Sequence, residues 1–262
     1  TMHIISPDHQ VLRFAGVDAE AFLQSQLTND VAALRPGSWQ WQGYCTAKGR
    51  LLATFALAQS GGGEYLAAVH RSLATAIAKR LTMYRLRSKV EITLPEDLAV
   101  QLHLAAPAPQ PGVQVTLALG NERWMTIEIA QVANADSTEA DADRAADFMQ
   151  RWALAGITAL QAEITADTTE RFVPQMIGWD TVTPGGGISF GKGCYPGQEV
   201  VARAHYRGAV KRHIEVASFP AADLVAGSEV TLPDGRTAEI CNIAVRHATE
   251  TVALLVVGNQ SG

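Results

Sequence analysis

The feature that most constrains the fold of this chain is a glycine-rich stretch around one cysteine, GGGISFGKGCYPGQE, from Gly185 to Glu199. Six of these residues are glycines, and glycine tolerates positive φ and close approach by other atoms. We therefore expect a conformationally demanding loop. Gly197 suits the N-cap of a helix whose first turn contains Gln198 and Glu199.

Cys194 occupies a setting within this stretch that favours a thiolate. It comes just before the positive end of the expected helix dipole, and Lys192 adds a positive charge two residues away. A lone cysteine is more often a small buried apolar residue than a reactive one, whereas its glycine-rich, polar neighbours favour chemistry or recognition. The residues alone leave both interpretations open.

Composition excludes several classes of protein. With 262 residues the chain exceeds the usual size of one core, so two or three lobes are expected. Apolar residues make up 47% and charged residues 18%, a globular balance. No apolar run approaches the roughly 18 to 20 residues of a membrane span, and the start of the sequence has no signal-peptide pattern. We expect a cytoplasmic protein with no membrane partner.

The three cysteines, Cys45, Cys194 and Cys241, are far apart and form no Cys-x-x-Cys pair. They predict neither a disulfide framework nor a local zinc site, and three thiols cannot make a four-thiolate cluster site. We therefore expect no metal bound by this chain alone. The formal net charge of −5 argues against direct nucleic-acid binding, which needs a broad basic surface.

Hydrophobic patterning predicts an α+β fold. Asp18 suits the N-cap of a helix over 19–27, residues 39–44 and 51–58 predict a hairpin, and Ser72 suits the N-cap of the next helix. A further helix carries Phe148 and Trp152, and residues 136–143 before it are either a linker or its first turns. From His213 onward the pattern predicts only short strands, which indicate a small barrel or sandwich, over 214–217, 229–232, 238–245 and 251–257.

A basic run follows the cysteine stretch. It extends from Arg203 to His213, and no acidic residue lies between Val200 and Ile214. On an acidic protein this run is either a local anion site for carboxylates or phosphates, or a solvated basic segment.

The segment KGCYPGQE, Lys192 to Glu199, resembles the signature of the YgfZ/GcvT-type folate-binding family, which is related to a mitochondrial iron-sulfur assembly factor and to the glycine-cleavage aminomethyltransferase. The similarity continues on both sides of this segment. It also includes the N-terminal helix, the Cys45 to Leu51 hairpin turn and an upstream Phe-x-Pro-Gln segment. The matching segments are residues 22–31, 45–51, 172–175, 186–190, 200–204 and 206–208.

This resemblance implies an α+β, three-lobed ring like the aminomethyltransferase fold, with a small C-terminal β-barrel. Its first lobe would combine residues 1–43 with 134–204 and carry the folate-channel helix and the cysteine loop. The second α+β lobe would cover 44–133, and the barrel 205–262. The central channel would hold tetrahydrofolate or a derivative.

The resemblance also implies the functional residues. Cys194 and Lys192 would face the channel, and the folate contacts would come from Asn29, Asp30, Gln175, Tyr195, Gln198, Glu199, Arg203 and Arg207. Two positions depart from the aminomethyltransferases. The strand Leu51-Leu52-Ala53-Thr54 lacks their catalytic aspartate, and Thr158 stands at about the place of their folate-binding glutamate.

Three functions are consistent with this pattern. The first is a tetrahydrofolate-binding accessory protein without classical turnover. It would support iron-sulfur cluster assembly or repair in partner client enzymes, including tRNA-modifying ones. The second is a folate-dependent one-carbon transferase that uses Cys194 as its nucleophile. The third is a scaffold that binds no folate.

Overall fold

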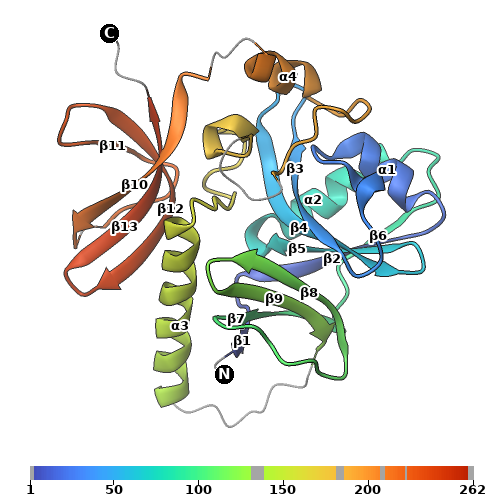
Figure 1. Cartoon of the computed structure of the whole chain (residues 1–262), viewed down its shortest axis with the longest axis horizontal. Helices are drawn as coiled ribbons and strands as arrows, with labels where there is room; N and C mark the ends of the chain where they lie inside the picture. The colour runs from blue at the N-terminus through green and yellow to red at the C-terminus, as the bar shows by residue number, and fades with distance from the viewer. Residues whose placement is uncertain (1–2, 131–138, 181–185, 207–209, 222, 259–262) are drawn as a thin grey trace.

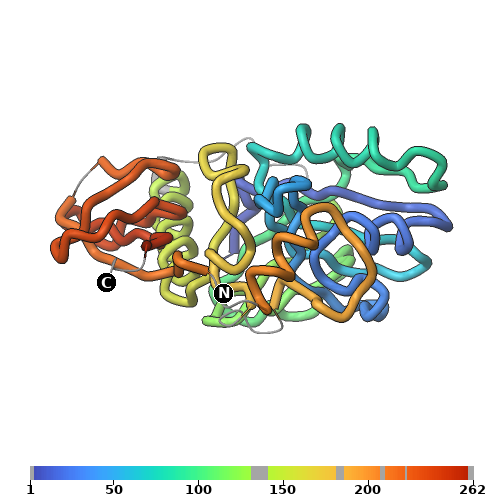
Figure 2. The backbone as a smooth tube through the Cα atoms, turned by 90° about the horizontal axis from the view of Figure 1, so that it is seen from above, coloured from blue at the N-terminus to red at the C-terminus, as the bar shows by residue number. Residues whose placement is uncertain are grey.

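The computed structural model describes residues 3–130, 139–180, 186–206, 210–221 and 223–258. Within these ranges the chain forms three antiparallel sheets and four α-helices. Figure 1 shows a twisted C-terminal sheet on one side, the long helix α3 (Glu139–Thr158) beside it, and the other two sheets beyond that helix. Figure 2 shows the same order from above, with the C-terminal strands at one end of the molecule. The predicted α+β class is confirmed.

The largest sheet has five strands in the order β3-β4-β5-β2-β6. Residues 39–45 and 51–61 pair as the predicted hairpin, with Trp39 opposite Ala58 and Gly43 opposite Thr54. Two helices pack on this sheet through a shared apolar core. The elements are β2 (His9–Ala15), α1 (Ala19–Gln26), β3 (Trp39–Cys45), β4 (Leu51–Gly61), β5 (Glu64–His70), α2 (Arg71–Tyr84) and β6 (Glu91–Thr93).

A second, four-stranded sheet packs against the first, with the order β1-β7-β9-β8. Side chains alternate between the two faces of a strand, so Phe55 and Leu57 of β4 enter one core while Ala56 and Ala58 enter the core between the two sheets. This double burial explains why β4 is apolar almost throughout. The strands are β1 (His3–Ile5), β7 (Leu98–His103), β8 (Val113–Gly120) and β9 (Arg123–Ile129).

The C-terminal strands pair in the order β10-β13-β12-β11 and form a twisted, open half-barrel. All four were predicted from the sequence. Helix α3 packs along β12 and β13, so it joins this sheet to the rest of the molecule. The strands are β10 (Arg212–Pro220), β11 (Glu229–Thr231), β12 (Thr237–His247) and β13 (Glu250–Gly258).

The helix starts agree with the sequence in part. Asp18 occupies the predicted N-cap of α1, but its carboxylate accepts the Lys89 N–H at 2.6 Å instead of capping the helix. The prediction of Ser72 as the N-cap of α2 was wrong, because α2 begins at Arg71 and its N-cap lies two residues before Ser72. His70 takes that position, and its Nδ1 accepts the Ser72 N–H at 3.3 Å.

The structure leaves some sequence expectations as predictions. The lobe boundaries are among them, although the boundary between residues 43 and 44 falls within β3, which pairs with β4 in one sheet. The segment 136–143 lies partly outside the described residues, and its described part belongs to α3. None of the helices in the described ranges is long and apolar enough to cross a bilayer.

Candidate functional site

The cysteine loop is fastened to the end of α1 by hydrogen bonds from polar side chains. The Thr28 hydroxyl donates to the Gly187 carbonyl at 2.5 Å, and the Asn29 amide donates to the Gly186 carbonyl at 3.0 Å. A Cβ atom on Gly187 would lie 1.9 Å from the ring of Trp179. Only glycine therefore fits at this position, and Asn29 is used to hold the loop.

Lys192 is buried and directs its ammonium group at the C-terminal end of α1. Its Nζ donates to the carbonyl oxygens of Gln24 (2.6 Å), Asn29 (3.2 Å) and Leu27. Carbonyls at a helix C-terminus lack partners within the helix, and these three contacts use all the donors of the lysine. Burial lowers the pKa of Lys192 to about 8, although the nearby Asp30 carboxylate opposes this effect. The catalytic or other functional role of Lys192 beside Cys194 and the folate contact of Asp30 stay predictions.

The start of α4 (Gln198–Tyr206) packs directly on the turn of the β3–β4 hairpin. Gly197 has a φ of +82°, and a Cβ atom there would lie 2.5 Å from the Thr46 carbonyl oxygen and 2.6 Å from Gly49 Cα. The Gly197 carbonyl accepts the N–H groups of Val200 (3.1 Å) and Val201 (3.2 Å), as expected of the predicted N-cap. The cysteine loop and the hairpin turn, which carry two of the sequence segments singled out above, thus form one structural unit.

The remaining predicted residues divide into buried supports and exposed groups. Gln175, in the short 3-10 helix Pro174–Ile177, donates to the Val201 carbonyl at 2.6 Å and so supports α4. Tyr195 is buried, and the ammonium of Lys192 lies 5.1 Å from the centre of its ring. Cys194, Glu199 and Arg203 are exposed, Gln198 is half-buried, and Arg207 lies outside the described residues.

A cavity of about 350 Å³ lies where the three sheets meet. We call it the central cavity. A narrow hollow of about 30 Å³ toward β4 and β5 shares lining residues with it, including Arg123 and Glu163, and we count this narrow extension as part of the same site. Its size falls in the range of small-molecule sites. His9 comes from the first sheet, Arg123 from the second, Asn242 from the third, and Trp152 from α3. Trp41, on β3, lines the narrow extension.

Glu163 is held at this cavity from several directions. The side-chain amide of Asn242 accepts the Glu163 N–H and donates to the Glu163 carbonyl, both at 2.9 Å. The Glu163 carboxylate lies 2.8 Å from Nε2 of the buried His9, whose Nδ1 lies 2.7 Å from the Ser6 hydroxyl. Because that hydroxyl can donate to Nδ1, the Nε2–H is left to donate to Glu163.

The charge of Glu163 is stabilised by its neighbours. Burial raises the pKa of this carboxyl, but His9, His70 and Arg123 outweigh burial and bring the pKa down to about 2. The carboxylate is therefore ionised at neutral pH, and one of its oxygens already accepts a hydrogen bond from His9. The side chain stays 38% exposed, so it is accessible to a molecule in the cavity.

Arg123 lines both parts of the cavity and is only 7% exposed. Its guanidinium lies 4.9 Å from the centre of the Trp152 ring, and its buried Nε–H has no hydrogen-bond partner among the described residues. A Cβ atom on Gly156 would lie 2.6 Å from Nη1, so glycine within α3 makes room for the guanidinium. Burial lowers the pKa of Arg123 to about 10, an effect that Glu163 partly offsets. Arg123 remains a cation at neutral pH.

Gln161 adds an unpaired acceptor to this unpaired donor. Its amide nitrogen donates to the Leu119 carbonyl at 2.5 Å, whereas its buried Oε1 has no partner among the described residues. Unpaired buried polar atoms are uncommon in native structures. Both atoms have almost no accessible surface, so the accessible acceptor that the central cavity offers a ligand is the Glu163 carboxylate.

Sequence reasoning missed Arg123, Gln161 and Glu163. Thr158, at about the position of the folate-binding glutamate of aminomethyltransferases, ends α3 and is exposed. Its hydroxyl donates to the Leu154 carbonyl at 2.8 Å. Thr158 lines a different hollow, whereas Glu163, five residues later, lines the central cavity. The sequence contained one signal for Glu163, because it is an acidic residue that comes soon after the long helix.

No side chain predicted as a catalytic or folate contact lines the central cavity as the described residues define it. Their ligand roles stay predictions. Among the described residues there is also no grouping of three or more His, Cys, Asp or Glu side chains that could hold a metal ion.

The fold defines the class of protein. The glycine-cleavage aminomethyltransferase T of Bartonella henselae superposes with a TM-score of 0.64 at 13% identity, over 95% of this chain and 76% of that one. This similarity shows an aminomethyltransferase fold, as the sequence resemblance implied. No family model matches the chain.

Individual relatives define the family. The tRNA-modifying protein YgfZ of Escherichia fergusonii is 30% identical over 254 residues, which cover 87% of this chain and 72% of the relative. The protein of the same name from Cronobacter sakazakii is 31% identical over 79% of this chain and 68% of its own length. The chain belongs to the YgfZ family.

Proposed function

We propose that this protein binds a reduced folate in the central cavity and supports iron-sulfur enzymes without turning over a substrate in bulk. The observation that carries the proposal is that the buried Arg123 guanidinium and the Glu163 carboxylate line the same cavity beside two tryptophans, Trp41 and Trp152. A buried cation whose Nε–H lacks a partner is unfavourable. Arg123 lines the cavity, so a ligand acceptor that contacts its guanidinium would stabilise the buried charge.

The pterin ring of a folate fits these residues. Its pyrimidine edge presents adjacent N–H and amino donors together with a carbonyl acceptor on a flat ring. Glu163 would accept from the donors, Arg123 would donate to the carbonyl oxygen, and the indoles would pack on the ring.

Bound reduced folate would supply one-carbon chemistry. The residues of this chain favour an accessory role over catalysis. The strand Leu51 to Thr54 has no acid where aminomethyltransferases carry a catalytic aspartate, and Cys194 is absent from the described lining of the central cavity. A transferase that uses Cys194 would need the thiol near the folate. The second function considered from sequence is therefore less well supported.

Cys194 is instead available to a partner protein, because its side chain is exposed on a loop that several hydrogen bonds hold in place. The relatives are named tRNA-modifying proteins. We propose that this chain contributes to tRNA modification indirectly, through iron-sulfur enzymes that modify tRNA, with the cysteine loop as the contact surface.

Two experiments test these proposals. Calorimetric titration with 5-formyltetrahydrofolate should show one site per chain, and it should be lost in Arg123→Met and kept in Cys194→Ser. Absence of binding by the unmodified protein would leave the scaffold function. For the accessory role, cells that carry only the Cys194→Ser variant should lose activity of cluster-dependent tRNA-modifying enzymes. Full activity of those enzymes after deletion of the gene would contradict it.

A further inference from the structure

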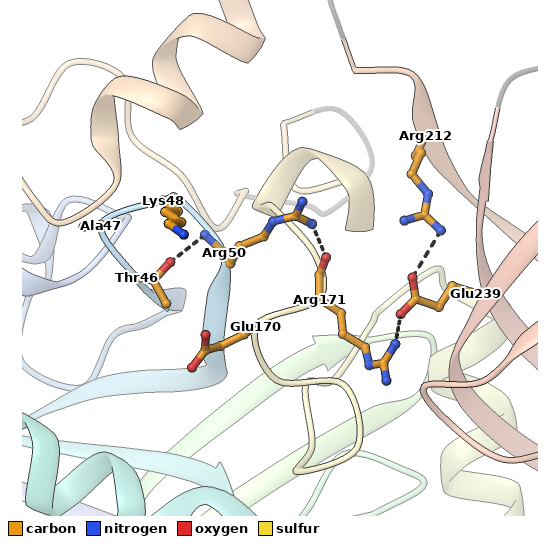
Figure 3. A pocket seen from close by; sticks show the side chains of 8 residues that line it. All are labelled: Thr46, Ala47, Lys48, Arg50, Glu170, Arg171, Arg212 and Glu239. Atoms are coloured by element: carbon orange, nitrogen blue, oxygen red, sulfur yellow. Dashed lines mark hydrogen bonds and ion pairs between the residues drawn. The ribbon is translucent and has the colours of Figure 1, made fainter.

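A second hollow lies between the β3–β4 hairpin turn and the C-terminal sheet. It is an open cleft of about 660 Å³. We call it the basic cleft, and Figure 3 shows its side chains. They are Thr46, Ala47, Lys48, Arg50, Glu170, Arg171, Arg212 and Glu239.

Positive charge exceeds negative charge in the basic cleft, with four cations against two carboxylates. Glu239 is already neutralised, because it pairs with Arg171 at 2.7 Å and with Arg212 at 3.2 Å. In Figure 3 the Glu170 carboxylate points away from the arginines. The side chain of Lys48 is exposed and makes no hydrogen bond or ion pair within the described ranges.

The remaining cations keep donors free for a ligand. Arg50 donates one Nη group to the Arg171 carbonyl, and Arg212 uses one Nη group on Glu239. Each guanidinium has five N–H donors in all. The basic cleft is therefore suited to an anion that carries more than one charge.

The basic cleft and the central cavity are neighbours along the same two chain segments. Residues 161–167 line the central cavity and residues 170–171 line the basic cleft, while β12 gives Cys241 to the first and Glu239 to the second. Asp167 and Glu170 are three positions apart in the chain, so their Cα atoms are at most about 11 Å apart. An extended ligand in the cavity thus needs to reach only a short way to the cations.

We propose that the basic cleft binds the γ-linked glutamate chain of a polyglutamylated folate. This inference rests on the proposed folate site in the central cavity. The glutamate chain is the anionic end of a folate, and each added glutamate contributes a carboxylate for Lys48, Arg50 or Arg212. The basic cleft then selects folates by tail length, whereas the central cavity recognises the ring.

The test compares 5-formyltetrahydrofolate carrying one glutamate with the same compound carrying five, by calorimetry at low ionic strength. We expect about tenfold tighter binding of the pentaglutamate, the value of one charge-assisted hydrogen bond. Added salt should reduce this advantage. The double variant Lys48→Gln/Arg212→Gln should remove it and leave monoglutamate affinity unchanged. Arg151→Gln, an exposed arginine on α3 outside both hollows, is the matched control.

The double variant is expected to fold, because Lys48 has no partner within the described ranges and Glu239 keeps its ion pair with Arg171. Its thermal unfolding midpoint checks this point. A peptide of five γ-linked glutamates, without the ring, probes the basic cleft alone and should bind the unmodified protein more tightly than the double variant.

The outcomes separate the two proposals. Equal affinity for both folates would overturn the basic-cleft proposal and leave the folate site intact. Binding of the glutamate peptide without binding of either folate would support the basic cleft as a polycarboxylate site and overturn the folate function. Loss of the tail advantage in inorganic phosphate, but not in chloride of equal ionic strength, would assign the basic cleft to phosphate instead.

Discussion

Replacing Arg123 with methionine should stabilise the ligand-free protein and abolish folate binding. Most large-to-small or polar changes in a core destabilise a protein. Arg123 is expected to differ because its guanidinium is buried, 7% exposed overall, with the Nε–H unpaired. Methionine is unbranched and fills irregular space well, so the substitution removes the polar group and keeps most of the packing.

The magnitude follows from two opposing contributions. An unsatisfied buried polar group costs about 1 to 3 kcal/mol, and its removal recovers that amount. Loss of the cation–π contact with Trp152, 4.9 Å from the ring centre, costs about 0.5 to 1 kcal/mol. Glu163 keeps its hydrogen bond from His9. The net expectation is a gain of about 1 kcal/mol in the free energy of unfolding, and a rise of about 2 to 4 °C in the melting temperature.

Urea and thermal unfolding of the ligand-free variant measure the first effect, and calorimetric titration with 5-formyltetrahydrofolate measures the second. We expect the affinity to fall by at least about a hundredfold, because the variant loses a charge-assisted hydrogen bond to the folate at a buried, desolvated position. Arg151→Met, on an exposed face of α3, should change neither quantity. Destabilisation by more than about 2 kcal/mol, or unchanged affinity, would show that Arg123 has a structural role instead.

Three further predictions concern single residues. Glu163→Gln should weaken folate binding about tenfold or more in the same titration. Because the folded-state pKa of Glu163 is lowered to about 2, the ionised carboxylate stabilises the fold above about pH 5, and this contribution is lost as the pH falls toward 2. The Gln variant should therefore lose less stability than the unmodified protein over that pH range in urea titrations. An identical loss in both proteins would contradict the lowered pKa of Glu163. Lys192→Met should reduce the free energy of unfolding by about 2 to 3 kcal/mol, because three hydrogen bonds to carbonyls are lost; a change below about 0.5 kcal/mol would show that these bonds are weak. Gly197→Ala should cost at least about 2 kcal/mol, measured in the same way, since φ is +82° and the Cβ atom would meet the Thr46 carbonyl, and tolerance of alanine would refute the close packing of loop and hairpin.

Local patterning predicted much of the fold, because the signals lie within short segments. The apolar run 51–58 gave β4, and the alternation after His213 gave all four C-terminal strands. The glycines predicted a loop packed tightly on other backbone, and the contact between Gly197 and Gly49 is of that kind. The N-cap of α2 was missed because a histidine nitrogen took the role expected of Ser72.

The central cavity was not predictable in the same way, because its groups come together only through tertiary packing. Arg123 begins a strand and Glu163 follows a helix, forty residues later. In sequence, an arginine at a strand start looks like a surface residue. Its burial depends on Gly156 and Trp152 of α3, which lie on a separate element.

The orientation of Lys192 was also not predictable from its position in the sequence. Its position two residues from Cys194 predicted an electrostatic effect on the thiol. The structure directs its ammonium group to the carbonyls that end α1, which are distant in sequence and need donors. The orientation of a long side chain depends on the partner that packing brings within reach, and spacing along the chain does not determine it.

A crystal structure of the protein with 5-formyltetrahydrofolate would test the central claim most directly. We expect the pterin ring in the central cavity, with its pyrimidine edge on Glu163 and Arg123. A folate bound at the cysteine loop, away from both residues, would contradict it, as would a cavity that stays without ligand at saturating concentration.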